Sequence, residues 1–405
     1  MPFRFLLLWL ASSIAWAAEP SIFAQVDEML NGLTQITGWK VQRKVPAEML
    51  SKDKFRQFVD SSMKEAAGDR EIQAQETMLK MFGLVPADFD LARELAELLT
   101  EQAAAFYDYK KKRLFILDTT TESVELRMAL VHELAHALAD QQHPLGNFMK
   151  QGSPDDDAIT ARQAVTEGQA TWLTSAYLSM KAGGKAEVPQ PMIDMVSSGV
   201  GVEGEAYPVF TKAPLYIRDS LTFPYTEGLR FQDGVYRDRG RAAFDQVFND
   251  PPDSTQQVMH PQSYLQHIEP AKVRMPELSA AIGKDAGKYR KRTDGTLGEF
   301  DISALLRQHI GEEKGVEAAT HLRGGTYRLF EHKDQKSPVL AHITEWDSPQ
   351  SAKTYFEMYQ QVMKKKWKKF TTASWTSTEI RGQGDSGAFL LRLEGNTVQA
   401  FEGLR

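Results

Sequence analysis

The sequence predicts an α+β fold, and three observations support that prediction. Apolar residues recur at helical spacing through most of residues 18–100 and again in two longer segments after residue 118. A hairpin pattern separates these parts. Strand-like runs surround one helical segment near the C-terminus. We therefore expect four regions: a signal peptide (1–17), a helical region (18–100), a central domain (101–315) and a small α+β domain (316–405).

The N-terminus has the parts of a secretory signal peptide. Arg4 supplies the positive charge, and an apolar run extends from Phe5 to Trp16. Ala15 and Ala17 give the small-residue pattern of a cleavage site. The alternative is an N-terminal membrane anchor, for which this run is short. We expect residues 1–17 to be removed from a protein exported to the periplasm or the extracellular space.

Composition narrows the classes of function. The formal net charge is −6, which argues against a nucleic-acid partner because such proteins usually carry a basic face. No later segment is apolar enough to span a bilayer, so we expect no stable membrane insertion after signal removal. The chain contains no cysteine, so a metal site would have to use His, Asp and Glu. The sequence leaves the oligomeric state open.

The helical region shows no chemical motif. Ile22, Val26 and Met29 follow a helical period, and Leu91 begins another apolar run of this kind. Gly83 marks a helix end between them. We expect this region to support the packing of the central domain, with a removable pro-segment as the alternative.

A hairpin and two long helices open the central domain. Apolar runs flank the polar turn of a hairpin at residues 104–118. Thr119 and Glu122 fit a capping box for a helix that Pro144 closes. Ser153 fits the N-cap of a second helix, which we expect to run to about Lys181.

The rest of the chain divides into two parts. Residues 185–315 contain many prolines and are expected to be mixed and rich in loops. In the last region, Ser348 fits the N-cap of a helix with strand-like runs on both sides. The lysines at 364–366 and 368–369 follow that helix and are interpreted as solvated residues that complement its dipole.

The motif His132-Glu133-Leu134-Ala135-His136 lies in the first long helix. At positions i and i+4 the two imidazoles share one face and are close enough to chelate a single metal ion. Glu133 points to the flank, where it can reach a metal-bound water without binding the metal. Two solvated histidines are the alternative interpretation.

Glu167 is the best candidate for a third ligand. It lies on the second long helix, beside Gly168, which is costly inside a helix by about 1 kcal/mol. Such a glycine indicates close approach of another element, as expected where two helices share a metal. His143 is a poorer candidate because it lies two helical turns beyond His136, roughly 10 Å along the axis.

This pattern resembles the gluzincin branch of zinc metallopeptidases, in which an HExxH helix is followed by a distant glutamate on a second helix. The chain also resembles a group of exported bacterial zincin-like proteins over about residues 103–300. The segments that carry this resemblance are AAFYDYKKKRLFILD, HELAHALADQQH, TEGQAT, FPYTEGLRF, PPDSTQQVMHPQSY and TLGEF. The resemblance implies a zincin fold, with a small sheet over the HExxH helix and the glutamate helix beneath it.

One position departs from the gluzincin pattern. Thr171 stands four residues beyond Glu167, where the family places an acid that supports a histidine ligand. Asp140 lies one turn beyond His136 and could accept an imidazole N–H instead, although an ordinary solvated aspartate is an equal alternative.

The site predicts zinc-dependent hydrolysis of peptide bonds in a peptide or protein substrate, with one Zn²⁺ per chain. Glu133 would act as general base and then acid. Tyr225 and His260 are the candidates for a second electrophile beside the zinc. The strand at residues 113–117 could bind substrate by strand addition.

Two other functions stay open. One is a zinc-stabilised binding protein whose catalysis has decayed, although a closed structural zinc site needs no base beside the metal. The other is a zinc amide hydrolase that acts on cell-wall peptides or on an N-terminal residue.

Overall fold

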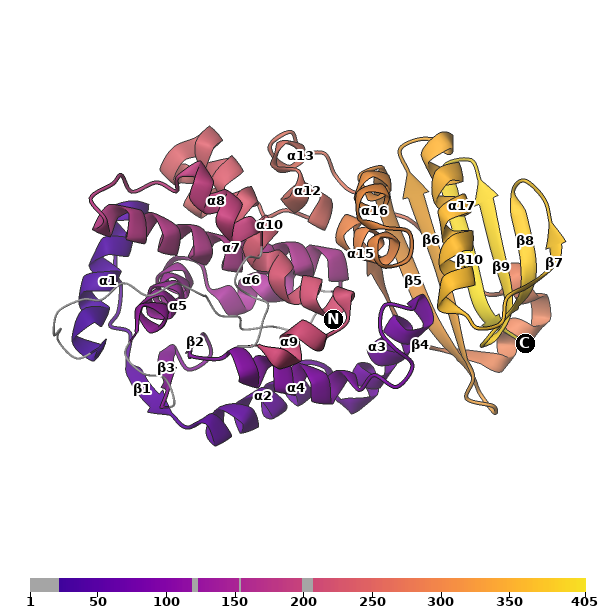
Figure 1. Ribbon diagram of the computed structural model, residues 1–405, viewed down its shortest axis with the longest axis horizontal. Helices are drawn as coiled ribbons and strands as arrows, with labels where there is room; N and C mark the ends of the chain where they lie inside the picture. The colour runs from indigo at the N-terminus through magenta and orange to yellow at the C-terminus, as the bar shows by residue number, and fades with distance from the viewer. Residues whose placement is uncertain (1–21, 119–122, 153, 199–206) are drawn as a thin grey trace.

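The computed structural model describes residues 22–118, 123–152, 154–198 and 207–405. The predicted signal peptide, the predicted capping box at 119–122 and Ser153 lie outside these ranges. The fold is α+β, as predicted: it is mostly helical, with a seven-stranded sheet in its C-terminal part (Figure 1). Within the described ranges, we find no helix with the length and apolar character needed to cross a membrane.

The first part of the chain combines helices with a three-stranded sheet. Its elements are α1 (Ile22–Thr37), β1 (Ala47–Leu50), α2 (Lys52–Ala67), α3 (Asp69–Phe82), α4 (Leu91–Gln102), β2 (Ala105–Asp108) and β3 (Arg113–Leu117). The predicted hairpin is confirmed as β2 and β3. Gly83 ends α3 in the left-handed conformation, with a φ of 78°.

Strand β1 was not predicted, and it changes the position of β3. It pairs with β3 in parallel, so the order in the sheet is β1-β3-β2. The side chains of Glu48 and Met49 are exposed, so β1 carries no alternating apolar pattern that would reveal a strand. Since β3 is paired on both sides, it cannot take up a substrate strand, and that prediction was wrong.

Helices dominate the middle of the chain. Its elements are α5 (Val124–Gln142), α6 (Leu145–Gln151), α7 (Asp156–Lys181), α8 (Gln190–Ser197), α9 (Pro208–Lys212), α10 (Leu215–Arg239), η1 (Gly240–Ala242), α11 (Ala243–Asn249), α12 (Thr255–Met259) and α13 (Pro261–Leu265). The two predicted long helices are confirmed as α5 and α7. Their N-caps are Ser123 and Asp155, whose side chains accept hydrogen bonds from the backbone three residues on, so both helices begin later than predicted.

Helix α10 contradicts the prediction that residues 185–315 are rich in loops. It continues through Pro224, which usually interrupts a helix. It packs against α7 at two glycines, Gly168 and Gly228. The predicted close approach to Gly168 is therefore confirmed, but the approaching element is α10 rather than the HExxH helix.

The C-terminal part is built on the large antiparallel sheet. Its elements are α14 (Ser279–Ile282), η2 (Gly283–Lys288), β4 (Tyr289–Leu297), α15 (Glu299–His309), α16 (Glu312–Ala319), β5 (Leu322–His332), β6 (Pro338–Trp346), α17 (Pro349–Lys366), β7 (Thr371–Trp375), β8 (Glu379–Gly384), β9 (Gly387–Glu394) and β10 (Thr397–Leu404). The strand order is β4-β5-β6-β10-β9-β8-β7. Ser348 is the N-cap of α17, as predicted. The sheet begins with β4, which precedes residue 316.

The buried apolar residues form three clusters. One surrounds α1, α5, α7 and α10. A second joins α3 and α4 to α15, α17 and one face of the large sheet. A third covers the opposite face of that sheet with residues that include Met275 and Leu278. Figure 1 shows α17 across the face of the sheet, with α15 and α16 between the sheet and the helical part.

Lys366 is not the solvated lysine that we expected. Its Nζ lies 2.7 and 2.9 Å from the Glu402 carboxylate oxygens, and both side chains are buried. Nζ also donates to the Met81 carbonyl oxygen at 2.8 Å. Lys366 therefore lies inside the protein, where it pairs with a buried carboxylate on β10. Its contact with Met81 also connects α17 to α3. His342 lies nearby, fully buried, with its ring against Phe82.

Candidate metal centre

The two histidines of the motif share one face of α5. Their Nε2 atoms are 3.1 Å apart, and their rings meet edge to face. Most residues from Leu126 to Gln141 are buried, so α5 is surrounded by the α1, α7 and β2 elements that it contacts. This central position holds the two imidazoles rigidly inside the helical part.

Glu167 of α7 completes the cluster. Its Oε2 lies 3.1 Å from the Nε2 of His132 and 3.2 Å from the Nε2 of His136. Among the described residues, these three side chains form the one group with the spacing of a metal site. The structure therefore brings together the three residues that were predicted as ligands.

The geometry of the three donor atoms fits a tetrahedral zinc ion. Bonds of about 2.0–2.1 Å to nitrogen and oxygen place tetrahedral ligand atoms roughly 3.3 Å apart. The observed separations of 3.1, 3.1 and 3.2 Å are close to this value. Two imidazole nitrogens and one carboxylate oxygen are also donors that suit zinc. In tetrahedral coordination, three protein ligands would leave a fourth position for water or substrate.

The electrostatics of the cluster also favour a cation. Burial alone would raise the pKa of Glu167, but the charge of His136, the hydrogen bonds of both imidazoles and the charge of His132 together outweigh burial and lower this pKa to about 2. Burial would lower the pKa of His136, yet the Glu167 carboxylate raises it to about 9. Burial lowers the pKa of His132. The site thus keeps a buried carboxylate ionised and requires positive charge beside it.

Glu133 lies beside this cluster, between α5 and β2. Its side chain is buried, and its Oε2 accepts a hydrogen bond of 2.7 Å from the Tyr107 N–H. Burial raises the pKa of Glu133 to about 8. Tyr107 was not singled out in the sequence. Its place in the predicted hairpin before the HExxH helix was the only feature of the sequence that could have indicated it.

The structure separates the two candidate electrophiles. The ring of Tyr225 stacks on His132, with centroids 5.7 Å apart and an interplanar angle of 22°. His260 lies between α12 and α13, where its Nε2 is 2.8 Å from Glu299 Oε1. Within the described ranges, His260 forms no hydrogen bond, ion pair or ring contact with the three clustered side chains. Tyr225 is therefore the better placed of the two.

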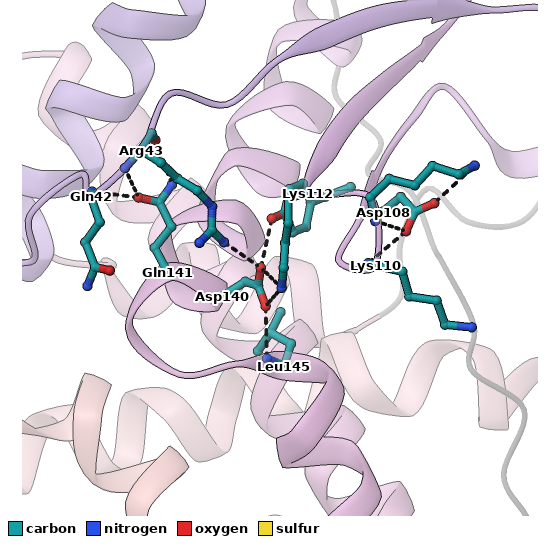
Figure 2. A network of polar contacts seen from close by, with 10 residues as sticks. Gln42, Arg43, Asp108, Lys110, Lys112, Asp140, Gln141 and Leu145 are labelled. Carbon is teal, nitrogen blue, oxygen red and sulfur yellow. Dashed lines mark hydrogen bonds and ion pairs between the residues drawn. The ribbon is translucent and has the colours of Figure 1, made fainter.

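Asp140 does not support a histidine. Its oxygens contact Arg43, Lys112, the Tyr107 hydroxyl and the Leu145 N–H instead (Figure 2). With these donors in place, its side chain is buried and faces the hairpin rather than His136. Both alternatives that the sequence left for Asp140, a histidine partner and a solvated residue, were wrong.

Thr171 also forms no hydrogen bond with an imidazole in the described part of the chain. It is buried, and its hydroxyl has no hydrogen-bond partner among the described residues. The Nδ1 of His132 likewise has no partner within the described part of the chain. His143 faces away from the cluster, because its Nε2 lies 2.7 Å from Asp245 Oδ1. The gluzincin pattern places an acid at position 171 that would accept a hydrogen bond from a histidine ligand. Here Thr171 takes that position, and the His132 Nδ1 lacks such a partner in the described part of the chain.

Comparison with known proteins gives a match only in the C-terminal part of the chain. A family model described as "Domain of unknown function (DUF8575)" matches residues 288–405. This range begins beside β4 and includes every strand of the large sheet. No curated protein and no solved structure matches the chain. The candidate metal centre lies outside the matched range, so its function is argued from its chemistry.

Proposed function

We propose that this protein is a zinc-dependent peptidase in which His132, His136 and Glu167 hold one Zn²⁺ and Glu133 is the general base. The convergence of three donor atoms within 3.2 Å of one another carries this proposal. Glu133, one residue from a ligand and with its carboxylate buried between α5 and β2, distinguishes the site from a purely structural one.

The residues of the site divide the chemistry between them. A bound zinc ion would lower the pKa of a water molecule and polarise the scissile carbonyl group. Glu133 removes a proton from the attacking water and delivers it to the leaving amine nitrogen. Tyr225 donates its hydroxyl proton in a hydrogen bond to the developing oxyanion, since its ring already lies against His132.

The surrounding elements support a zincin-like core of the gluzincin type. The three-stranded sheet lies beside α5, and α7 carries the glutamate. The far edge of β2 has no strand partner in the described ranges, although its Tyr107 N–H already donates to Glu133, so an extended peptide could add there only through the other backbone groups of that edge. A peptide or protein substrate outside the cytoplasm agrees with the predicted signal peptide.

Metal content is the first test. We expect one zinc ion per chain in the purified protein and loss of that zinc in the variants His136→Ala and Glu167→Ala. His143→Ala is the matched control, because His143 ends the same helix but pairs with Asp245. Full zinc occupancy in Glu167→Ala would disprove the ligand set.

Peptide hydrolysis is the second test. Glu133→Gln should keep its zinc and lose turnover, whereas Glu125→Gln, in the first turn of the same helix, should keep both. A peptide library with blocked and free N-termini, together with cell-wall peptides, separates an endopeptidase from the amide hydrolase. A zinc-loaded wild type that cleaves no member of the library would favour the binding protein instead.

A further inference from the structure

Asp140 holds four separate segments of the chain at the C-terminal end of α5. Its fully buried carboxylate accepts hydrogen bonds from the Tyr107 hydroxyl at 2.9 Å and from the Leu145 N–H at 3.1 Å. The Nζ of Lys112 lies 2.7 and 2.9 Å from its two oxygens, and a guanidinium nitrogen of Arg43 lies 3.2 Å away. Figure 2 shows Arg43, Lys112 and Leu145 around the Asp140 carboxylate. Two cations and two neutral donors are ample compensation for a buried negative charge.

Tyr107 connects Asp140 to the base of the proposed reaction. Its N–H donates to Glu133, while its hydroxyl donates to Asp140. Glu133 and Asp140 are two helical turns apart, which corresponds to roughly 10 Å along the axis. One residue of β2 is therefore attached to α5 at two distant points, and this fixes both the position and the direction of the strand.

The other partners of Asp140 extend this attachment to the rest of the small sheet. Lys112 occupies the hairpin turn with a φ of 54°, a left-handed conformation that is unfavourable for a non-glycine residue. In this conformation its Nζ contacts both oxygens of the Asp140 carboxylate. Arg43 precedes β1, and its N–H donates to the side chain of Gln141, the neighbour of Asp140 (Figure 2). The segments leading to all three strands thus meet at one carboxylate.

We propose that Asp140 is a positioning residue, which sets the register of the three-stranded sheet on α5 and so places the Tyr107 N–H against the Glu133 carboxylate. The structural part of this inference stands on the contacts alone. Its consequence for catalysis rests on the proposed function, because the direction of the Glu133 carboxylate affects the reaction only if Glu133 is the general base.

The exchange rate of the Tyr107 amide hydrogen tests the structural part. In the full chain, Asp140→Ala should accelerate this exchange at least tenfold relative to wild type, as measured by NMR. Tyr107→Phe and Lys112→Gln remove one contact each, so we expect severalfold effects even if Asp140→Ala fails to fold. Lys110→Gln is the matched control, since Lys110 lies in the same turn but pairs with exposed Glu65. Exchange that stays at the wild-type rate in Tyr107→Phe and Lys112→Gln would overturn the inference.

Kinetics and metal content test the catalytic part and separate it from the proposed function. Asp140→Asn should keep one zinc per chain, with kcat reduced about tenfold and KM changed less than twofold. A lower melting temperature with unchanged kcat would mean that Asp140 is only structural and would overturn the positioning role. If the wild type cleaves no peptide, the proposed function fails, and the amide exchange still decides whether Asp140 positions Tyr107.

Discussion

Gly168 of α7 and Gly228 of α10 are in backbone contact. A Cβ atom added to Gly168 would lie 2.1 Å from the carbonyl carbon of Gly228, and one added to Gly228 would lie 2.3 Å from the carbonyl oxygen of Ala164. These obstacles are backbone atoms, which cannot move without separating the two helices. Since Glu167 is the neighbour of Gly168, this contact also determines where the proposed third ligand lies.

Gly168→Ala should therefore lower both stability and metal affinity. We expect a loss of about 3 kcal/mol in the free energy of unfolding, because the added methyl group overpacks a rigid contact. Zinc affinity should fall as α7 moves away from α5. Gly287→Ala is the control, since a Cβ there meets nothing within 4 Å. Denaturant unfolding and zinc titration measure the two effects, and equal stability of the two variants would contradict the prediction.

Tyr225→Phe should reduce kcat by about a hundredfold, the usual loss when one oxyanion donor is removed. The zinc content should stay at one per chain, because Tyr225 stacks on His132 without being a ligand. His260→Gln should change kcat less than fivefold, since His260 pairs with Glu299. Steady-state kinetics on both variants decides between the two candidates, and a larger loss in His260→Gln would reverse their roles.

The buried ion pair of Lys366 and Glu402 predicts that removing one charge lowers the unfolding free energy more than removing both. Lys366→Met leaves the Glu402 carboxylate buried without its cation and should cost about 3–5 kcal/mol of unfolding free energy. Adding Glu402→Gln to this variant should recover most of that loss. Lys365→Met, at an exposed neighbour on the same helix, should change stability by less than about 0.5 kcal/mol. A double variant no more stable than Lys366→Met would show that the charge is not the cause.

His342 should make stability fall in mild acid. Burial lowers its pKa to about 3, with a further contribution from Lys366, whereas in the unfolded chain its pKa is near 6.5. Its contribution is complete above pH 6.5 and is lost as the pH falls toward 3, because only the unfolded state then binds the proton. His342→Phe should remove on the order of 2 kcal/mol of this dependence between pH 6.5 and 5. The exposed His321→Gln is the control, and parallel stability curves for wild type and His342→Phe would refute the prediction.

Local patterns predicted the elements that carry the proposed ligands. The apolar period of α5 and α7 places both helices, and the i, i+4 spacing in α5 puts the two imidazoles together. Gly168 indicated a close contact, because a glycine inside a helix is costly without one. Only the identity of the approaching helix was wrong.

Contacts between distant parts of the chain could not be predicted in this way. Strand β1 exists because its backbone pairs with β3, while its side chains show no strand pattern. Helix α10 was missed because Pro224 suggests a break, although the helix continues through it. The partners of Asp140 lie up to 97 residues away in the chain, so its role became visible only in three dimensions.

The family match begins at residue 288, but the second apolar cluster contains residues from both sides of that position. Residue 288 is therefore not the start of an independently folding unit. Leu79 and Phe82 of α3 belong to the same cluster as Tyr327 and Leu340 of the large sheet. A fragment that began at residue 288 would leave this apolar surface exposed to water. We therefore expect this fragment to aggregate when it is expressed alone. In the full chain, residues before 288 cover the same apolar surface.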